Sequence, residues 1–279
     1  MTKEFTAKQK FLIAVICAVI LCCLSVVRID GKFVNRFSSE LRIGTLNRQD
    51  AEKLKFFPRI RELSVSDMQA GEISFLEYMP LLESFSVDYL TEPLTDISAL
   101  SACRNLEYVC LDGYAELSDL SCFSDADRLQ VLWIGQFLIG DINIHSLNGI
   151  ESLTPGLKSL ALSGVEETAV STEQFPQLKY LDYLQICYSS VEEVTFSHKA
   201  VRYLNVADNP KLKEIHFEDA ERLETLDYHG CPELIISKEE LMHLPSLKKI
   251  MISDYQFSEQ EIKSLKAHGM EVTVYSEEE

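Results

Sequence analysis

The sequence predicts an α/β solenoid, in which a parallel, concave β-sheet faces short helices or turns on the convex side. The first observation is a pattern, L-x-x-L-x-L, that recurs nine times at intervals of 21 to 28 residues, and such self-similarity is typical of repeat architectures. The second is a proline two residues before four of the copies, where its fixed φ suits a corner. The copies begin at Ile60, Leu82, Leu106, Leu129, Leu157, Leu178, Val201, Leu223 and Leu247.

Each copy predicts one short strand, because its last three residues alternate inward, outward and inward. Every unit turns the same way, so the strands are expected to be parallel and to share one buried row of Leu, Ile and Val. The register of one unit stays open, since LKYLDY from Leu178 and LDYLQI from Leu181 both fit the pattern.

The segments between the strands predict short helices or turns. ISKEELMHL and FSEQEIKSLKAHG each contain a capping box, at Ser237 with Glu240 and at Ser258 with Glu261, and Gly269 marks the end of the second helix. NRQDAEKLKFF predicts a helix that covers the first end of the array, and GMEVTVYS predicts a closing strand.

On these residues the chain resembles a leucine-rich repeat protein, and LTDISAL and LSDL resemble the short bacterial repeats of internalin-like surface proteins. The resemblance covers residues 56–275. It implies an Asn after each strand, which is present at Asn209 and replaced by Cys231 in the next unit. The matching positions of the other units are mostly apolar, so the polar ladder of the family is expected to be mostly missing.

The N-terminus predicts a membrane segment. A basic tail, 1–10, precedes an uncharged apolar run, 11–27, which favours a signal anchor with the repeat domain outside the cell. A cleaved signal peptide ending near Cys23-Leu24-Ser25, and hence a secreted protein, is the alternative. Residues 28–55 are expected to form a juxtamembrane segment and an N-terminal cap, and 276–279 an acidic tail.

Charge restricts the partners. The formal net charge is −18, and it divides into +5 for residues 1–55 and −23 for the rest. Such an acidic main domain repels phosphate backbones, so nucleic-acid binding is not expected, whereas a partner with a basic surface is favoured. Five cysteines lie outside the apolar run without C-x-x-C spacing, so neither a disulfide framework nor a zinc module is expected.

The outward positions of the strands predict a partner-binding patch, because exposed Tyr and Trp are enriched at binding hot spots. The alternative is that the rings only pack against one another across the sheet. The predicted patch consists of Tyr108, Trp133, Tyr180 and Tyr203, with carboxylates at Asp88, Asp112, Asp182 and Asp227.

No sequence motif indicates an enzyme. H-E-x-x-H, G-x-S-x-G, the P-loop and G-x-G-x-x-G are all absent, so we expect no catalytic residue, metal or cofactor. His229 and Cys231 lie close in sequence but lack a second pair of ligands. The sequence therefore predicts a non-enzymatic, membrane-tethered protein-binding domain. Two alternatives are a tethered, cytoplasmic-facing scaffold that regulates an intracellular enzyme, and a hydrolase with an unrecognised carboxylate site.

Overall fold

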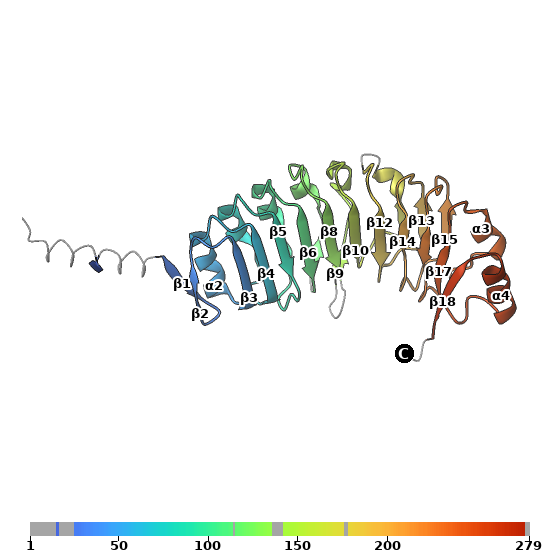
Figure 1. Cartoon of the computed structure of the whole chain (residues 1–279), viewed down its shortest axis with the longest axis horizontal. Coiled ribbons are helices and arrows are strands. Elements are labelled where there is room, and N and C mark those ends of the chain that lie inside the picture. The colour runs from blue at the N-terminus through green and yellow to red at the C-terminus, as the bar shows by residue number, and fades with distance from the viewer. Residues whose placement is uncertain (1–14, 17–24, 114, 136–141, 176–177, 277–279) are drawn as a thin grey trace, which may run out of the picture.

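The computed structural model describes residues 15–16, 25–113, 115–135, 142–175 and 178–276. Its main feature is a parallel sheet of eleven strands that lie side by side along the long axis (Figure 1). The predicted solenoid is thereby confirmed. In sheet order the strands are β3 (Glu40–Leu46), β4 (Glu62–Met68), β5 (Ser84–Val87), β6 (Tyr108–Asp112), β8 (Val131–Gly135), β10 (Ser159–Ser163), β12 (Tyr183–Cys187), β14 (Tyr203–Asn205), β16 (Thr225–Asp227), β17 (Lys249–Ser253) and β18 (Glu271–Tyr275).

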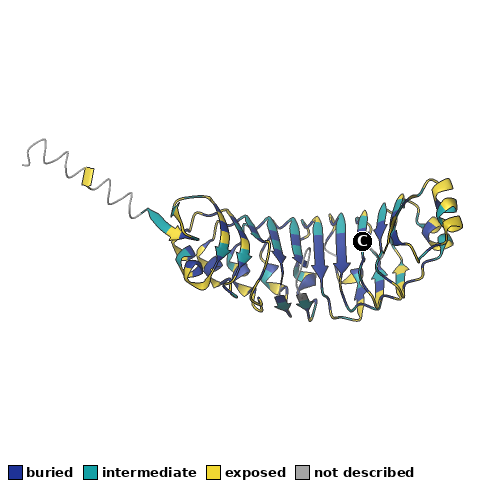
Figure 2. Ribbon diagram, turned by 90° about the horizontal axis from the view of Figure 1, so that it is seen from below, coloured by how far each residue is buried: buried dark blue, intermediate teal, exposed yellow. Residues whose placement is uncertain are grey.

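The inward positions of neighbouring strands form continuous buried rows. Phe85 pairs with Val109 and Val109 with Leu132, and all three are fully buried. Burying one such side chain contributes about 1.5–3 kcal/mol. The core is one cluster that extends from Ile29 to Val272 (Figure 2), as expected when every repeat packs on its neighbours.

The register near Leu178 follows the second of the two patterns. β12 begins at Tyr183, and its inward residues Leu184 and Ile186 continue the rows of β10. Leu178 and Leu181 are buried in the turn before the strand. The copy counted from Leu178 was therefore placed three residues too early.

The convex side is built from short helices, as predicted. Both capping boxes are present, at the starts of α3 (Lys238–His243) and α4 (Glu259–Ala267). Five further connections contain a single 3₁₀ segment, which is η2 (Ser74–Tyr78), η3 (Ser98–Ala102), η4 (Ser121–Phe123), η5 (Ile150–Ser152) or η6 (Thr172–Gln174). The connections from β12 to β14 and from β14 to β16, which the structure describes in full, contain no helix.

Two small parallel sheets were not predicted. One pairs β7 (Ala115–Leu117) with β9 (Ile142–Ile144), and the other pairs β11 (Ala169–Ser171), β13 (Glu193–Phe196) and β15 (Glu214–Phe217). The apolar-acidic step LSDL begins at the end of β7, and IGDI runs into β9.

The N-terminal end differs from the prediction in three ways. Val26 and Val27, assigned to the apolar helix, lie in β1 (Val26–Ile29), which forms an antiparallel hairpin with β2 (Lys32–Asn35). The sheet begins with β3, one strand before the first copy that the sequence pattern identified. The predicted end-covering helix, α2 (Arg48–Lys53) followed by η1 (Leu54–Phe56), instead connects β3 to β4.

The predicted membrane segment lies almost entirely outside the described residues. Within the part of the chain that the structure describes, no helix has the length and apolar character needed to cross a membrane.

Candidate protein-binding surface

The central feature of the concave face is a row of four aromatic side chains, which we call the aromatic row: Tyr108, Trp133, Tyr183 and Tyr203. Successive ring centroids lie 6.3, 6.5 and 5.0 Å apart, which is the range of favourable aromatic contacts. The row crosses from β6 to β14 and skips β10, whose outward residues are small. All four rings are half-buried, so each keeps an accessible surface.

Small side chains on β10 create the gap in the row. Ser159 accepts a hydrogen bond from the Trp133 indole nitrogen at 2.7 Å, which holds the indole in position. Ala161 pairs with Trp133 across the sheet and is almost completely buried. The Trp133 and Tyr183 rings therefore approach each other over this strand without an intervening side chain of their size.

Three of the four predicted aromatic residues lie on the concave face, and one does not. Tyr108, Trp133 and Tyr203 lie at outward positions of the sheet, as expected. Tyr180 does not: it precedes β12 and is 66% exposed. Tyr183 takes its place, because the strand starts three residues later. Ser189, eight residues after Leu181, is the signal that could have identified this register, since it stands where the repeat consensus has Asn.

The predicted carboxylates differ in burial and in their hydrogen-bond partners. Asp182 lies just before β12 and receives two hydrogen bonds from the Arg202 guanidinium, at 2.5 and 2.9 Å. These hydrogen bonds lower the pKa of Asp182. Asp112 is buried on β6. Asp88 follows β5 and is exposed, so it is the carboxylate of this set that can best reach a partner.

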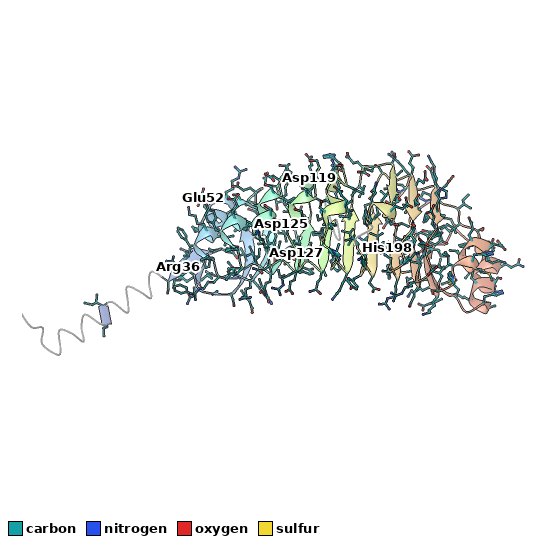
Figure 3. All side chains as sticks on the ribbon, turned by 90° about the horizontal axis from the view of Figure 1, so that it is seen from above. Arg36, Glu52, Asp119, Asp125, Asp127 and His198 are labelled. Carbon is teal, nitrogen blue, oxygen red and sulfur yellow. The ribbon has the colours of Figure 1, made fainter. Side chains whose placement is uncertain are left out.

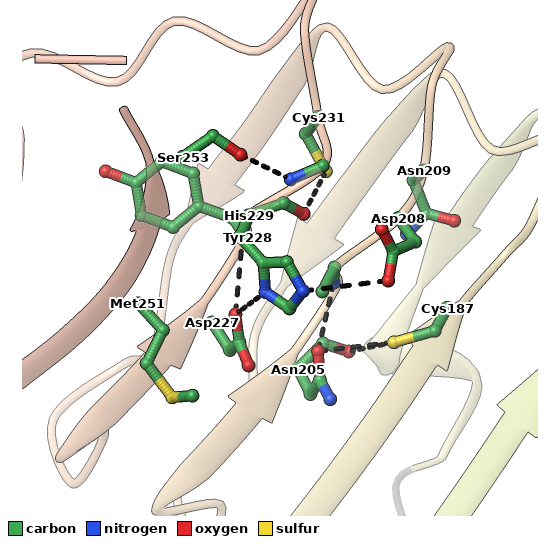
Figure 4. A network of polar contacts seen from close by, with 12 residues as sticks. Cys187, Asn205, Asp208, Asn209, Asp227, Tyr228, His229, Cys231, Met251 and Ser253 are labelled. Atoms are coloured by element: carbon green, nitrogen blue, oxygen red, sulfur yellow. Dashed lines mark hydrogen bonds and ion pairs between the residues drawn. The ribbon is translucent and has the colours of Figure 1, made fainter. Parts of the chain in front are cut away.

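Asp227 belongs to a separate polar network at the C-terminal end of the sheet (Figure 4). Its buried carboxylate lies 2.7 Å from Nδ1 of His229, and Asp208 lies 3.7 Å from Nε2. The Asp227 hydrogen bond raises the pKa of His229. The ring also stacks on Tyr275, with centroids 4.3 Å apart. Gly230 has φ +68°, and a Cβ there would lie 2.3 Å from an Asp208 carboxylate oxygen.

The thiols near the face are not activated nucleophiles. Desolvation raises the pKa of Cys110, beside Tyr108, to about 11, and burial raises that of Cys187 as well. The thiolate is the reactive form, so neither residue is poised for catalysis. Among the described residues, no three His, Cys, Asp or Glu side chains are grouped closely enough to hold a metal ion.

Desolvation also keeps the phenol groups of the aromatic row neutral. Desolvation is the largest effect on Tyr108, and it raises the pKa to about 12. Desolvation likewise raises the pKa values of Tyr183 and Tyr203. The row can therefore offer a partner ring faces and neutral hydroxyl groups, but no phenolate.

Comparison with known proteins supports the fold. No protein-family model and no curated protein sequence matches the chain. A chain from the octameric complex of Latrophilin 3 (Lec, Olf), Unc5D (Ig, Ig2, TSP1) and FLRT2 (LRR) is similar in structure, at 17% identity and TM-score 0.51, with 90% of this chain and 87% of that chain covered. The fold is that of a leucine-rich repeat protein. An internalin (inlF) from Listeria monocytogenes str. 4b F2365 aligns at 14% identity and TM-score 0.40, with 87% and 89% covered.

Proposed function

We propose that the chain is a non-enzymatic protein-binding module whose aromatic row holds a basic segment of a partner protein. The row itself carries the proposal. Four accessible rings stand on one rigid sheet, and Tyr and Trp in such positions dominate the energetics of many interfaces. Because the sheet is already formed, binding costs little additional ordering.

A basic partner is favoured by the charges around the row. The outward positions of the described strands from β5 to β14 carry no Lys or Arg, whereas Asp88 is exposed beside Tyr108. A Lys or Arg side chain could therefore lie over a ring face and reach this carboxylate, and cation–π contacts contribute about 0.5–2 kcal/mol. The acidic composition of the chain would speed encounter with such a partner.

The proposal includes attachment to a membrane through the part of the apolar run before β1, residues 11–25, with the repeat domain outside the cell. The basic residues Lys3, Lys8 and Lys10 before the apolar run favour a cytoplasmic N-terminus, and Arg28, Lys32, Arg36 and Arg42 after the run reduce this bias. The structure limits the anchor on one side, because the strand β1 has begun at Val26.

The proposal is tested with the tagged full-length chain as bait for crosslinking and partner capture. Trp133→Ala combined with Tyr203→Ala should weaken capture of the same partner by roughly 30-fold or more, since a hot spot contributes at least about 2 kcal/mol. The matched control is Tyr180→Ala with Tyr255→Ala, which removes two exposed rings outside the row. Equal capture by both double variants, with unchanged thermal unfolding, would reject the row as the binding surface.

The second candidate is a tethered scaffold that faces the cytoplasm. The five cysteines of the described residues are all free thiols, and thiols stay reduced in the cytosol. Tyr255→Cys introduces an exposed reporter thiol, which is a better target than Cys110 with its raised pKa. Labelling of intact cells by an impermeant reagent would support export. Labelling only after lysis would establish the cytoplasmic orientation.

A further inference from the structure

The N-terminal end of the solenoid exposes three phenylalanine rings. Phe33 on β2 is 79% exposed, Phe37 in the following loop 57% and Phe56 at the end of η1 44%. Exposed apolar surface gathered at one place on a protein marks interaction sites. These three rings belong to the hairpin and the first repeat, and β3, β4 and β5 separate them from the first strand of the aromatic row.

Basic side chains lie against these rings. The guanidinium carbons of Arg36 and Arg59 are 6.0 and 5.3 Å from the Phe37 centroid, and the Lys55 ammonium is 5.5 Å from that of Phe56. Within the described part of the chain, Lys55 and Arg59 have no carboxylate within 4.0 Å. Neither group therefore forms an ion pair with a described residue, and each lies against a ring face instead.

The sign of the charge at this end is opposite to that of the rest. Residues 25–61 contain nine Lys/Arg and four Asp/Glu, a balance of +5, whereas residues 62–279 contain 14 and 39, a balance of −25. The described protein thus has one basic, aromatic end on an acidic solenoid. We call the set Lys32, Phe33, Arg36, Phe37, Lys55, Phe56 and Arg59 the basic-aromatic end.

The basic-aromatic end lies where the apolar run enters the fold. The Arg36 backbone nitrogen donates a hydrogen bond to the Ser25 carbonyl at 2.8 Å, which ties the loop carrying Phe37 to the C-terminal end of that run. Figure 3 shows Arg36 at the extreme end of the solenoid. Val27 and Val34 pack underneath on the core, so the hairpin is held rather than free to swing.

We propose that the basic-aromatic end rests on an anionic lipid bilayer. In proteins that lie on a membrane, Phe, Trp and Leu side chains enter the boundary between headgroups and acyl chains, and neighbouring Lys and Arg bind anionic headgroups. The inference rests on the proposed membrane segment for proximity, but it is independent of partner binding at the aromatic row. Its consequence is that the long axis points away from the bilayer and the concave face stays open.

The experiment places a single tryptophan at this end of the full-length chain. Phe33→Trp in a Trp133→Phe background is mixed with vesicles of phosphatidylcholine, with or without phosphatidylglycerol, whose acyl chains carry bromine as a quencher. We expect a blue shift and strong quenching in the phosphatidylglycerol vesicles. Tyr255→Trp in the same background reports on the opposite end, and its emission should not change.

Charge reversal separates a specific contact from mere proximity. Arg36→Glu, Lys55→Glu and Arg59→Glu together should reduce the quenching roughly fivefold or more, since each basic group contributes to attraction by anionic lipid. The matched control reverses Lys238, Lys263 and Lys266 on α3 and α4, which changes the net charge equally at the far end. Circular dichroism checks that both triple variants fold.

Three outcomes would overturn the proposal. Equal quenching of both triple variants in both lipids would mean that the apolar run alone brings residue 33 to the bilayer. Flotation with the vesicles without quenching would retain the anchor and reject the contact. A chain that floats with neither vesicle would reject the contact and the membrane segment together, and would leave binding at the aromatic row to be judged by its own test.

Discussion

The two halves of the solenoid satisfy the backbone hydrogen-bonding groups after each strand in different ways. At the N-terminal end the residues after the repeat pattern are apolar: Met68 and Leu90 are buried and pair across the sheet, and the Met68 nitrogen donates to the Tyr89 carbonyl at 2.8 Å. The first two strands of the sheet, β3 and β4, have seven residues each. Near the C-terminus, β14 and β16 have only three residues each.

Side chains replace the missing backbone pairing in the C-terminal half. The Asn209 amide donates to the carbonyls of Ile186 and Val206 at 2.7 and 2.8 Å, and its oxygen accepts from the Ser189 nitrogen at 2.8 Å. Cys231 donates to the same Val206 carbonyl. At the position after the strand, the first half therefore has apolar residues that extend the backbone pairing. The second half has polar residues whose side chains hydrogen-bond to the backbone of neighbouring repeats.

The largest predicted effect tests this division. Asn209→Ala should lower the free energy of unfolding by about 3 kcal/mol, because the Ile186 carbonyl and the Ser189 nitrogen lose their side-chain partner and the Val206 carbonyl keeps only the weak bond from Cys231. Chemical denaturation measures the change. The reciprocal variant, Leu90→Asn, buries an amide in the apolar half and should cost a similar amount. A neutral Asn209→Ala would show that the side-chain ladder does not support the short strands.

A smaller effect is predicted for Tyr228, an inward residue between these polar positions. Its hydroxyl group is buried without a hydrogen-bond partner, and burial raises the pKa of the phenol. Tyr228→Phe removes the unsatisfied group and keeps the ring, so stability should rise by up to about 1 kcal/mol. Thermal unfolding measures it. A clear loss of stability would indicate that the hydroxyl group contributes to the fold.

The smallest effect is a pH dependence confined to the C-terminal half. Because the pKa of His229 is raised by its hydrogen bond with Asp227, the stability from this pair is fully present below the ordinary histidine pKa of 6.5. It is lost as pH rises through the folded-state value. His229→Gln should therefore destabilise the protein most near pH 5 and least near pH 8, as denaturation at several pH values would show. A cost that does not vary with pH would contradict the pairing.

Local patterns were sufficient where one residue type has one role. The capping boxes at Ser237 and Ser258 were predicted because a hydroxyl and a carboxylate three residues apart satisfy the first turn of a helix wherever it packs. Eight of the nine strand positions followed from the spacing of leucines. The ninth failed because Leu178 and Leu181 are both buried and both fit the apolar pattern, so that only the position of Ser189 in the sequence, or pairing with β10 in the structure, distinguishes them.

The candidate surface was predicted in part for the same reason. Tyr108, Trp133 and Tyr203 followed from strand alternation, but Tyr183 depended on the register. The partners of Asp182 and Asp227 were also not predictable, since Arg202 contacts Asp182 from the next repeat and His229 meets Asp227 only because of a tight turn.

The sequence by itself determined the repeat, the parallel direction of the strands and the outward rings, because periodic burial leaves one consistent arrangement of similar units. Tertiary structure alone decided that β3 opens the sheet and that Val26 and Val27 form a strand rather than the end of an apolar helix. β3 keeps the spacing of the copies, because Leu41 pairs with Leu63, but Ser38 stands where the pattern has an apolar residue. The β1–β2 hairpin is held by contacts with α2, such as the hydrogen bond from the Asp30 nitrogen to the Asp50 carboxylate.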